Sequence, residues 1–342
     1  MKAMLLDGVY NLRKTGEPLK FAEIPDPRPG KDELLLKVKT CGVCHTELDE
    51  IEGRTPPQRY PVVPGHQVVG EVLEAPSGSR YKTGDRVGVA WIFSSCGKCK
   101  FCLSGNENLC EQFVATGRDV NGGYAEYMAV PEKSVYLIPE TFSDTEAAPL
   151  LCAGAIGYRS LRLTNMANGN NLGLTGFGSS GQLVLKMARY NYPDSGIYVF
   201  ARSEKERKIA LDNGATWAGD TSDTAPVKLD TIIDTTPVWK PVIEALKNLD
   251  AGGRLVINAI RKEDHDKEAL TQLNYTQHLW MEKEIKSVAN VAYDDVRGVL
   301  ELAAEIPIIP DVKEFALEEA NKALLEIKKG HIQGASVLVM GK

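Results

Sequence analysis

Short runs of alternating hydrophobic and polar residues, separated by turn residues, dominate the amino-terminal part of the chain. Such alternation predicts β-strands at residues 34–39, 68–73 and 86–90. Few stretches show the three- to four-residue spacing of apolar positions that is typical of a long helix. We therefore expect this part of the chain to be mostly β.

The pattern changes after about residue 154, where strand-like and helix-like segments take turns. The predicted strands are 172–175, 197–200, 230–234 and 254–257. The predicted helices are 180–190, 203–213 and 239–249. This order predicts a parallel sheet that helices cover on both faces. A further helix at 317–329, ended by Gly330, and a strand at 336–339 are predicted near the carboxyl end.

Length and charge narrow the class of protein. A chain of 342 residues is too long for one simple core and suits two domains. The net charge of -6 argues against broad binding to nucleic acids or anionic membranes. The amino terminus has no signal-like apolar stretch, and the longest nearly apolar run, 147–158, is too short to span a bilayer. We expect a cytoplasmic protein that binds neither nucleic acid nor membranes.

Four of the seven cysteines lie within fifteen residues of one another. They are Cys96, Cys99, Cys102 and Cys110. Four thiolates can surround a zinc ion tetrahedrally at about 2.3 Å, which leaves no position for a substrate. This spacing therefore predicts a structural zinc site. Free or disulfide-bonded cysteines are the alternative, which a reducing compartment disfavours.

A second set of candidate metal ligands consists of Cys44, His66 and Cys152. Two thiolates and one imidazole neutralise zinc and leave its fourth position open, as in a catalytic site. Spacing alone leaves an alternative open, in which the histidine is structural and the cysteines belong to the core.

A glycine-rich segment with the pattern GxGxxG follows one predicted strand and opens a predicted helix. Its residues are Gly176, Phe177, Gly178, Ser179, Ser180 and Gly181. Such a turn brings the backbone and the helix amino terminus close to a dinucleotide pyrophosphate. The segment predicts dinucleotide binding; a purely structural glycine turn is the alternative.

The end of the second predicted strand of the parallel sheet bears on the choice of cofactor. Ala201 stands where an acidic residue usually holds the adenosine ribose of NAD. Arg202, Ser203 and Lys205 follow it and could hold a 2'-phosphate, which favours NADP over NAD. Alternatively, Arg202 and Lys205 are ordinary solvated helix residues.

Taken in order, these motifs resemble those of the medium-chain zinc-dependent alcohol dehydrogenases, including the cinnamyl alcohol dehydrogenase and bacterial branches. The resemblance covers nearly the whole chain and rests on Cys-His-Thr at 44–46, Gly-His at 65–66, Gly-Asp-Arg-Val at 84–87, the four-cysteine loop, Leu-Cys-Ala-Gly at 151–154 and the glycine-rich turn. It implies an α/β chain with a GroES-like, mostly-β catalytic domain at 1–153 and 291–342. A doubly wound Rossmann domain at 154–290 would bind the dinucleotide.

The resemblance also implies roles for individual residues. Cys44, His66 and Cys152 would bind catalytic zinc, and the four-cysteine loop structural zinc. Four neighbours would have the following roles: Thr46 would pass on the substrate proton, His45 would lie near the cofactor pyrophosphate, Glu47 would hydrogen-bond the free ring nitrogen of His66, and Trp91 would line the substrate pocket. Glu47 as a surface carboxylate and Trp91 as a core residue are the alternatives.

Three positions depart from the pattern of the family. Gln67 replaces a glutamate that often follows the zinc histidine, so the site lacks that negative charge. Asp49 stands where some members carry a relay histidine. Ala335 stands where many members have an arginine near the cofactor.

The implied function is reversible hydride transfer between a primary (allylic or aromatic included) or secondary alcohol and NADP or NAD, through a zinc-bound alkoxide. The proton would leave through Thr46, the cofactor ribose, and then Asp49 or solvent. Two zinc ions per chain, a small alcohol or aldehyde substrate and a homodimer or homotetramer are implied as well. Two alternatives keep the same fold: a zinc-independent enzyme related to quinone reductases, and a non-catalytic redox sensor that binds NAD(P).

Overall fold

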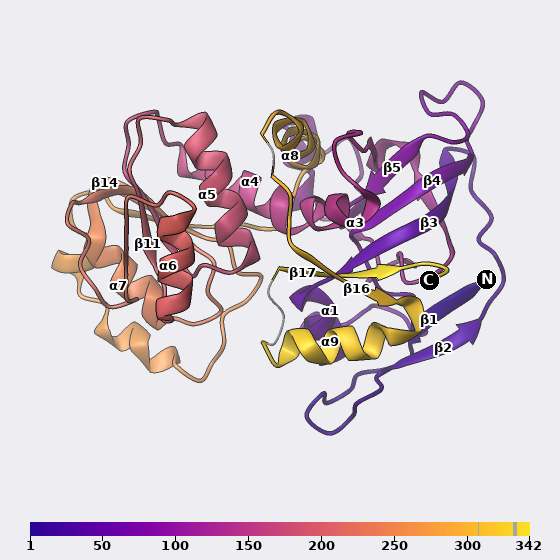
Figure 1. The fold of residues 1–342 in the computed structure, drawn as a ribbon, viewed down its shortest axis with the longest axis horizontal. Helices are drawn as coiled ribbons and strands as arrows, with labels where there is room; N and C mark the ends of the chain where they lie inside the picture. The colour runs from indigo at the N-terminus through magenta and orange to yellow at the C-terminus, as the bar shows by residue number, and fades with distance from the viewer. Residues whose placement is uncertain (307, 331–333) are drawn as a thin grey trace. The chain divides into compact units, whose positions relative to one another are not determined.

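The computed structural model describes residues 1–306, 308–330 and 334–342, and the chain forms two compact units. The first unit comprises Met1–Cys152 and Val291–Lys342, and the second comprises Ala153–Asn290 (Figure 1). Among the described residues, no helix is both long and apolar enough to cross a membrane.

A large sheet, antiparallel apart from one strand pair, organises the first unit, with the strand order β16-β17-β3-β4-β5-β9 and β8 paired to β3. Its strands are β3 (Glu33–Val43), β4 (Val68–Glu74), β5 (Arg86–Val89), β8 (Tyr127–Pro131), β9 (Val135–Leu137), β16 (Val312–Ala316) and β17 (Ala335–Val339). Only β16 and β17 run parallel to each other. Because β17 pairs with β3, the carboxyl-terminal segment completes a sheet that the amino-terminal segment begins.

Shorter elements surround this sheet. Two-stranded sheets are formed by β1 (Lys2–Leu6) with β2 (Leu19–Glu23), and by β6 (Ile92–Ser94) with β7 (Val114–Ala115). The α-helices are α1 (His45–Ile51), α2 (Lys100–Leu103), α3 (Asp144–Ala147), α8 (Tyr293–Glu305) and α9 (Ala320–Lys328). The 3-10 turns are η1 (Glu107–Leu109), η2 (Glu132–Ser134), η3 (Ala148–Leu151) and η6 (Leu317–Glu319).

The core of the first unit lies against the alternating face of β3. Leu34, Leu36 and Val38 are buried there, in one cluster with Ile51 of α1 and Leu324 of α9. The side chains of a strand alternate between its two faces, so this spacing delivers every second residue of β3 to the core. The packing of α9 against α1 supports the helix at whose amino end the candidate metal ligand Cys44 lies.

The second unit is built on a six-stranded parallel sheet with the order β12-β11-β10-β13-β14-β15. Its strands are β10 (Leu172–Thr175), β11 (Ile197–Phe200), β12 (Trp217–Gly219), β13 (Leu229–Asp234), β14 (Leu249–Ile257) and β15 (Glu284–Ser287). Its helices are α4 (Ala153–Thr164), α5 (Ser179–Asn191), α6 (Glu204–Asp212), α7 (Lys240–Asn248), the 3-10 helix η4 (Lys267–Gln272) and the π-helix η5 (Tyr275–Leu279).

The strand order determines where this unit can bind a ligand. The chain first moves outward from β10 to β11 and β12, then returns to the other side of β10 with β13. In such a doubly wound sheet, ligands bind outside the carboxyl ends of the strands where the order reverses. All four residues of β10 are buried, as expected for a strand that is covered on both faces.

The predicted mostly-β part and the predicted parallel sheet are both present, although several boundaries differ. The helix expected at 317–329 begins instead with the 3-10 turn η6, and its α-helical part starts at Ala320. The strand expected at 254–257 begins earlier, at Leu249. Other elements were not predicted from the sequence. They are the helices α1, α2, α3, α4 and α8 and the strands β1, β2, β6, β7, β8, β9, β12, β15 and β16.

Candidate functional site

Cys44, His66 and Cys152 come together in the first unit although they are far apart in the sequence. The Sγ atoms of Cys44 and Cys152 lie 4.0 Å apart. Nε2 of His66 lies 3.7 Å from Sγ of Cys44 and 3.4 Å from Sγ of Cys152. Within the described ranges, no fourth histidine, cysteine or carboxylate donor joins this cluster.

These separations fit a tetrahedral zinc ion. Zinc–sulfur bonds of about 2.3 Å and zinc–nitrogen bonds of about 2.0 Å place neighbouring donors about 3.5 to 3.8 Å apart in a tetrahedron. The observed distances of 3.4–4.0 Å bracket that range. Three donors leave a fourth position for a substrate, as in catalytic zinc sites.

The amino end of α1 positions two parts of this cluster at once. Cys44 is the N-cap of the helix, and its Sγ accepts a hydrogen bond from the backbone N–H of Thr46. One carboxylate oxygen of Glu47 accepts a hydrogen bond of 2.8 Å from the backbone N–H of Cys44. The other oxygen lies 2.7 Å from Nδ1 of His66. Glu47 therefore both caps the start of the helix and orients the imidazole, with Nε2 toward the two sulfurs.

Glycine residues make room for the loop that carries His66. Gly65 has a φ of +98°, and a Cβ there would lie 2.3 Å from the ring of Tyr124 and 2.8 Å from Sγ of Cys41. A Cβ on Gly122 would lie 2.0 Å from the carbonyl oxygen of Gly65. Because a side chain at either glycine would collide with fixed neighbours, this loop can hold His66 in place only with glycine at these positions.

The surroundings of the cluster raise the pKa values of Cys44 and His66. Burial lowers the pKa of His66, but the charges of Glu47 and Cys44 raise it, and the net pKa lies well above the ordinary value. The hydrogen bond to Cys152, together with burial, raises the pKa of the Cys44 thiol well above its usual range. Protons therefore compete with a cation for Cys44 and His66.

The predicted neighbours on α1 differ in exposure. His45 is exposed, Thr46 is half-buried, and Asp49 is buried. A carboxylate oxygen of Asp49 lies 2.5 Å from Nε of Arg54, whose guanidinium also binds Glu52 at 2.7 Å. The sequence reading did not single out Arg54, because a lone arginine in a turn carries no recognisable pattern.

Gln67 and Trp91, also singled out from the sequence, lie next to His66 in different ways. The Gln67 side chain covers Gly42 of β3, where a Cβ would lie 2.6 Å from the amide oxygen. The Trp91 ring lies 6.1 Å from that of His66, between centroids. The guanidinium of Arg118, a residue that sequence reasoning missed, lies 5.2 Å from the centre of the Trp91 ring.

The four-cysteine loop forms the second cluster, and its four sulfurs lie within 4.8 Å of one another. Sγ of Cys102 lies 3.9 Å from that of Cys96 and 3.6 Å from that of Cys99, again close to a tetrahedral edge. Hydrogen bonds from the backbone of Lys98 and Cys99 lower the pKa of the Cys96 thiol to about 6. Four donors complete a tetrahedron, so this cluster can hold a zinc ion but offers it no position for a substrate.

In the second unit, the glycine-rich turn lies between β10 and α5. Gly176 has a φ of +80°, and a Cβ there would lie 2.7 Å from Oγ1 of Thr235. Phe177 is buried, and Gly178 is the N-cap of α5, which begins at Ser179. A Cβ on Gly181 would lie 2.8 Å from the carbonyl oxygen of Gly176. The exposed Gly178 and Ser179 and the half-buried Ser180 lie at the positive end of a helix, where a pyrophosphate can bind.

The residues predicted to discriminate between cofactors lie at the end of β11. Ala201 is buried, whereas Arg202 and Lys205 are exposed. The Ser203 hydroxyl caps α6, because it accepts a hydrogen bond from the N–H of Glu206 and donates one to its carboxylate. Arg207, which the sequence reading missed, donates to the carbonyl oxygens of Ala201 and Arg202 at 2.9 and 3.0 Å.

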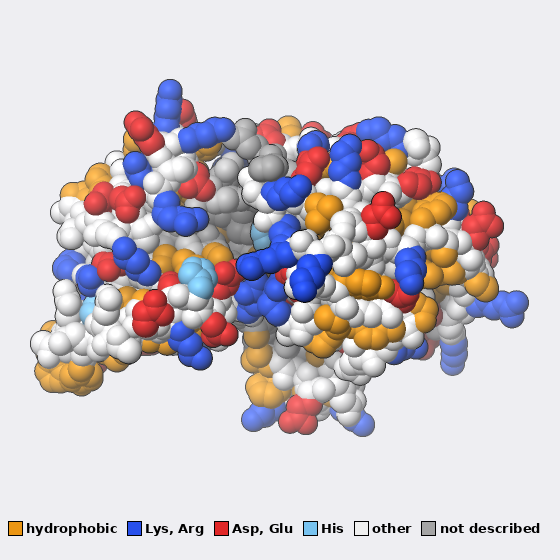
Figure 2. All heavy atoms as spheres, turned by 90° about the horizontal axis from the view of Figure 1, so that it is seen from below, with side chains coloured by type: hydrophobic (Ala, Val, Ile, Leu, Met, Phe, Trp, Pro, Cys, Tyr) orange, Lys and Arg blue, Asp and Glu red, His pale blue; other side chains and the backbone are white. Residues whose placement is uncertain are grey.

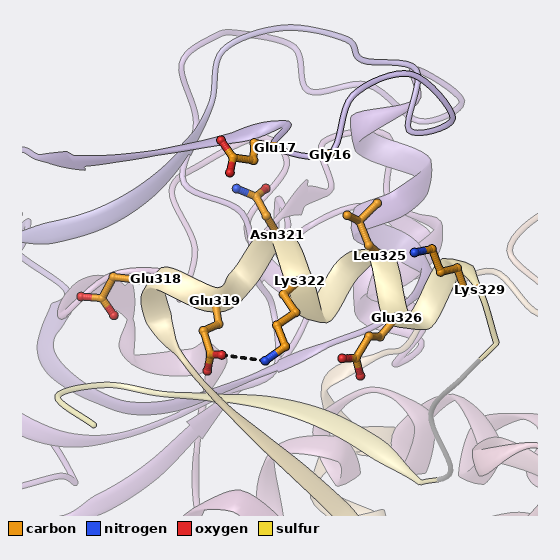
Figure 3. Close-up of a pocket in the computed structure, with 9 residues that line it drawn as sticks. All are labelled: Gly16, Glu17, Glu318, Glu319, Asn321, Lys322, Leu325, Glu326 and Lys329. Carbon is orange, nitrogen blue, oxygen red and sulfur yellow. Dashed lines mark hydrogen bonds and ion pairs between the residues drawn. The ribbon is translucent and has the colours of Figure 1, made fainter.

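A surface hollow of about 560 Å³ lies elsewhere, along α9 (Figure 3). Its lining residues are Gly16, Glu17, Glu318, Glu319, Asn321, Lys322, Leu325, Glu326 and Lys329. None of them belongs to the cysteine–histidine cluster, to the four-cysteine loop or to the glycine-rich turn. We assign no chemistry to this charged, solvated hollow.

Comparison with known proteins agrees with this geometry. A model of the alcohol dehydrogenase GroES-like domain matches residues 30–140. The probable alcohol dehydrogenase AdhA of Mycobacterium tuberculosis is 43% identical over 329 residues, covering 94% of this chain and 93% of its own length.

Two solved structures illustrate the likeness in fold. A cinnamyl alcohol dehydrogenase from Sorghum bicolor has a TM-score of 0.82 and 26% identity, over 99% of this chain and 97% of its own. A zinc-binding dehydrogenase from Sinorhizobium meliloti, solved with bound NADP, has a TM-score of 0.83 and 25% identity, over 99% and 98%. These likenesses confirm the predicted fold class, with a GroES-like part and a Rossmann-like parallel sheet.

We expect zinc uptake by the three-donor cluster to weaken as the pH falls. Cys44 and His66 have raised pKa values and must lose their protons before they bind zinc, so protons compete with the metal. The apparent affinity should fall by about tenfold or more for each pH unit. Titration of the zinc-depleted protein against a chromophoric chelator at pH 6, 7 and 8 measures this. An affinity of the three-donor site that does not change with pH would contradict the expected exchange of protons for zinc.

Proposed function

Because the chain belongs to the medium-chain zinc-dependent alcohol dehydrogenase family, we propose that Cys44, His66 and Cys152 form its catalytic centre. The family is that of NAD(P)-dependent alcohol oxidoreductases, which act on small alcohols and aldehydes. The observation that carries the proposal is the convergence of two sulfurs and one imidazole nitrogen to within 3.4–4.0 Å. Primary alcohols, allylic and aromatic ones included, and secondary alcohols are the proposed substrates.

The two clusters would hold two zinc ions with different tasks. Cys44, His66 and Cys152 would hold one ion, which would supply a Lewis acid for the substrate oxygen. The four cysteines from Cys96 to Cys110 would hold a second, structural ion that fixes their loop. With zinc bound, Glu47 would keep a proton on Nδ1 of His66, 2.7 Å from its carboxylate oxygen, and leave the lone pair of Nε2 for the metal.

Residues of α1 would carry the proton and meet the cofactor. Thr46 lies two residues after Cys44, and we propose that its hydroxyl accepts the proton of the alcohol while it donates its own proton onward toward solvent. His45, at the exposed start of the helix, would approach the pyrophosphate. Asp49 would pass the proton onward only if it could leave its contact with Arg54, so solvent is the simpler acceptor in our proposal.

The cofactor would lie across the glycine-rich turn from Gly176 to Gly181, and we propose that NADP is preferred. Ala201 offers no carboxylate for a ribose hydroxyl, whereas Arg202 and Lys205 are exposed cations beside it. The hydroxyl of Ser203 is engaged in capping α6, so we assign the 2'-phosphate to the two cations. The proposed preference rests on this arrangement of charges.

We further propose that the protein is a homodimer or a homotetramer that associates through β15. This strand ends the parallel sheet, and all four of its residues are exposed. Tyr275, Trp280, Met281 and Ile285 are exposed hydrophobic residues in or close to it. Figure 2 shows, for one face of the molecule, exposed hydrophobic side chains among charged ones. Two copies of β15 could pair antiparallel with Ile285 of one copy opposite Ile285 of the other. By symmetry, Glu284 of each copy would then lie opposite Lys286 of the other, so the pair would contain two contacts between opposite charges.

Replacement of Cys44 by serine tests the catalytic centre. We expect Cys44→Ser to lower kcat/KM for alcohol oxidation by about a thousandfold or more, because the Lewis acid contributes several kcal/mol to the transition state. Zinc content should drop by one ion per chain, and cofactor binding should persist because the second unit is unchanged. Cys41→Ala removes a buried thiol outside both clusters and is the matched control. Alcohol oxidation that survived the Cys44 change would show that the catalytic assignment is wrong.

The cofactor preference is tested at α6. We expect the double change Arg202→Ala and Lys205→Ala to lower the ratio of kcat/KM with NADPH to that with NADH by about tenfold, since each removes a charge-assisted contact to phosphate. A panel of aliphatic, allylic and aromatic aldehydes with both cofactors measures the ratio. Lys208→Ala, on the same helix, is the control. If the ratio did not change, the proposed contact of Arg202 and Lys205 with the 2'-phosphate would be wrong, and the two would be ordinary solvated residues.

Association through β15 is tested by a charge on its exposed hydrophobic residue. We expect Ile285→Glu to shift the protein toward the monomer in sedimentation velocity, because two carboxylates would then meet at the centre of the pair. Leu211→Glu, at an exposed leucine of α6, should leave the assembly intact. An oligomer that persisted in the Ile285 variant would place the interface on another surface.

A further inference from the structure

Asp234 is a buried carboxylate at the point where the order of the parallel strands reverses. It is the last residue of β13, has no exposed surface, and lies beside the end of β10. One of its oxygens accepts hydrogen bonds from Oγ1 of Thr175 at 2.7 Å and from Oγ1 of Thr236 at 2.8 Å. This is the edge of the sheet at which a doubly wound fold binds its dinucleotide.

Lys262 neutralises this carboxylate from the segment that follows β14. Its side chain is only 7% exposed, and its ammonium binds the second oxygen of Asp234. The ammonium also donates to the carbonyl oxygens of Thr236 at 2.7 Å and Val238 at 3.0 Å. Three acceptors match the three N–H groups of an ammonium, so the buried lysine is fully hydrogen-bonded.

Other contacts join the same two segments on either side of Lys262. The backbone N–H of Glu263 donates to the carbonyl oxygen of Pro237 at 2.6 Å. One carboxylate oxygen of Asp266 accepts hydrogen bonds from the backbone N–H groups of Trp239 and Lys240, at 2.8 and 2.9 Å. The segment after β14 therefore holds the segment after β13 at several points, with the buried ion pair among them.

The segment after β13 in turn supports the glycine-rich turn. The backbone N–H of Thr235 donates to the carbonyl oxygen of Thr175 at 2.9 Å. Its hydroxyl donates to the same oxygen at 3.0 Å and lies 2.7 Å from where a Cβ of Gly176 would be. A shift of Thr235 would therefore displace Gly176, the first glycine of the turn.

We propose that Lys262 is a positioning residue for dinucleotide binding, acting through Asp234 and Thr235 on the turn at Gly176. The inference rests on the proposed function, because it assumes that the turn binds the cofactor. A buried carboxylate without its cation is unfavourable, so loss of Lys262 would force the segment after β13 to rearrange. Lys262 itself does not touch the cofactor in this proposal, since all three of its N–H groups are already used.

The test compares binding of NADPH and NADH with turnover in the full-length enzyme. We expect Lys262→Met to raise the dissociation constant of the preferred nucleotide by about tenfold, within the usual range of coupling between linked residues. At saturating nucleotide, kcat should change by less than about threefold, because the metal cluster is unaltered. Lys267→Met, at a largely exposed lysine five residues away, is the control and should bind as the wild type does.

A second variant separates the effect of an unpaired charge on Asp234 from the loss of the contacts that Lys262 itself makes. Asp234→Asn combined with Lys262→Met leaves no buried charge, and the amide oxygen can still accept from Thr175 and Thr236. We expect this double variant to bind the nucleotide within about threefold of the wild type. If Lys262 acted only through its own contacts, adding Asp234→Asn to Lys262→Met would not restore nucleotide binding.

Several outcomes would overturn the inference. Unchanged nucleotide binding by a folded Lys262→Met protein would do so, as would a fall in kcat without a change in binding. If Lys262→Met does not fold, Thr175→Val removes one hydrogen bond to Asp234 and keeps the ion pair; binding weaker by about threefold supports the inference, and unchanged binding overturns it. A wild-type protein that binds neither NADPH nor NADH would contradict the proposed function itself and not this coupling alone.

Discussion

The close approach of two sulfurs and one imidazole nitrogen is the constraint on which the first unit depends. These donors come from segments separated by 22 and 86 residues, yet they lie within 4.0 Å of one another. Buried polar groups at such distances must be held by their surroundings, because burial of each group is unfavourable unless it has partners. The structure supplies that support through the start of α1, where Glu47 binds both the backbone of Cys44 and the ring of His66.

In the second unit, the glycine-rich turn also depends on the residues that surround it. Its glycine-rich turn must present backbone N–H groups to an anion while it stays folded against β10 and β13. Phe177 anchors the turn by its burial, and Thr235 lies against Gly176 from the neighbouring strand end. In both units, the residues that would touch a ligand are therefore held in place by neighbours that would not touch it.

Much of the fold could be read from the sequence, because its strongest patterns are local. The alternation of strands and helices between 172 and 257 marks a parallel sheet, whose buried strands are nearly continuous apolar runs. The edge strand β15 escaped notice because its four residues, Glu284 to Ser287, are all exposed and carry no alternation of burial. The seven-residue helix α1 was missed for a similar reason, since it is mostly polar and most of its buried face is acidic.

The candidate ligands were equally accessible to sequence reasoning, whereas their partners were not. Cys44, His66 and Cys152 stand in short motifs with residue types that metals require, and the role expected for Glu47 came from the resemblance to the family. Arg118 beside Trp91 and Lys262 beside Asp234 are contacts between residues that are far apart in the sequence. No local spacing announces such pairs, because only the three-dimensional arrangement of strands and loops brings them together.

The packing around Gly65 has a consequence for how this protein can vary. Gly117 and Gly122 press against the backbone of Gly65, and Gly65 itself leaves no space beside Tyr124. None of these glycines carries a group that could bind a metal or a substrate. Even so, the addition of a single methyl group to one of them would push His66 out of line with the two sulfurs. In a mutational scan, the positions least tolerant of change should therefore include residues that have no chemistry of their own.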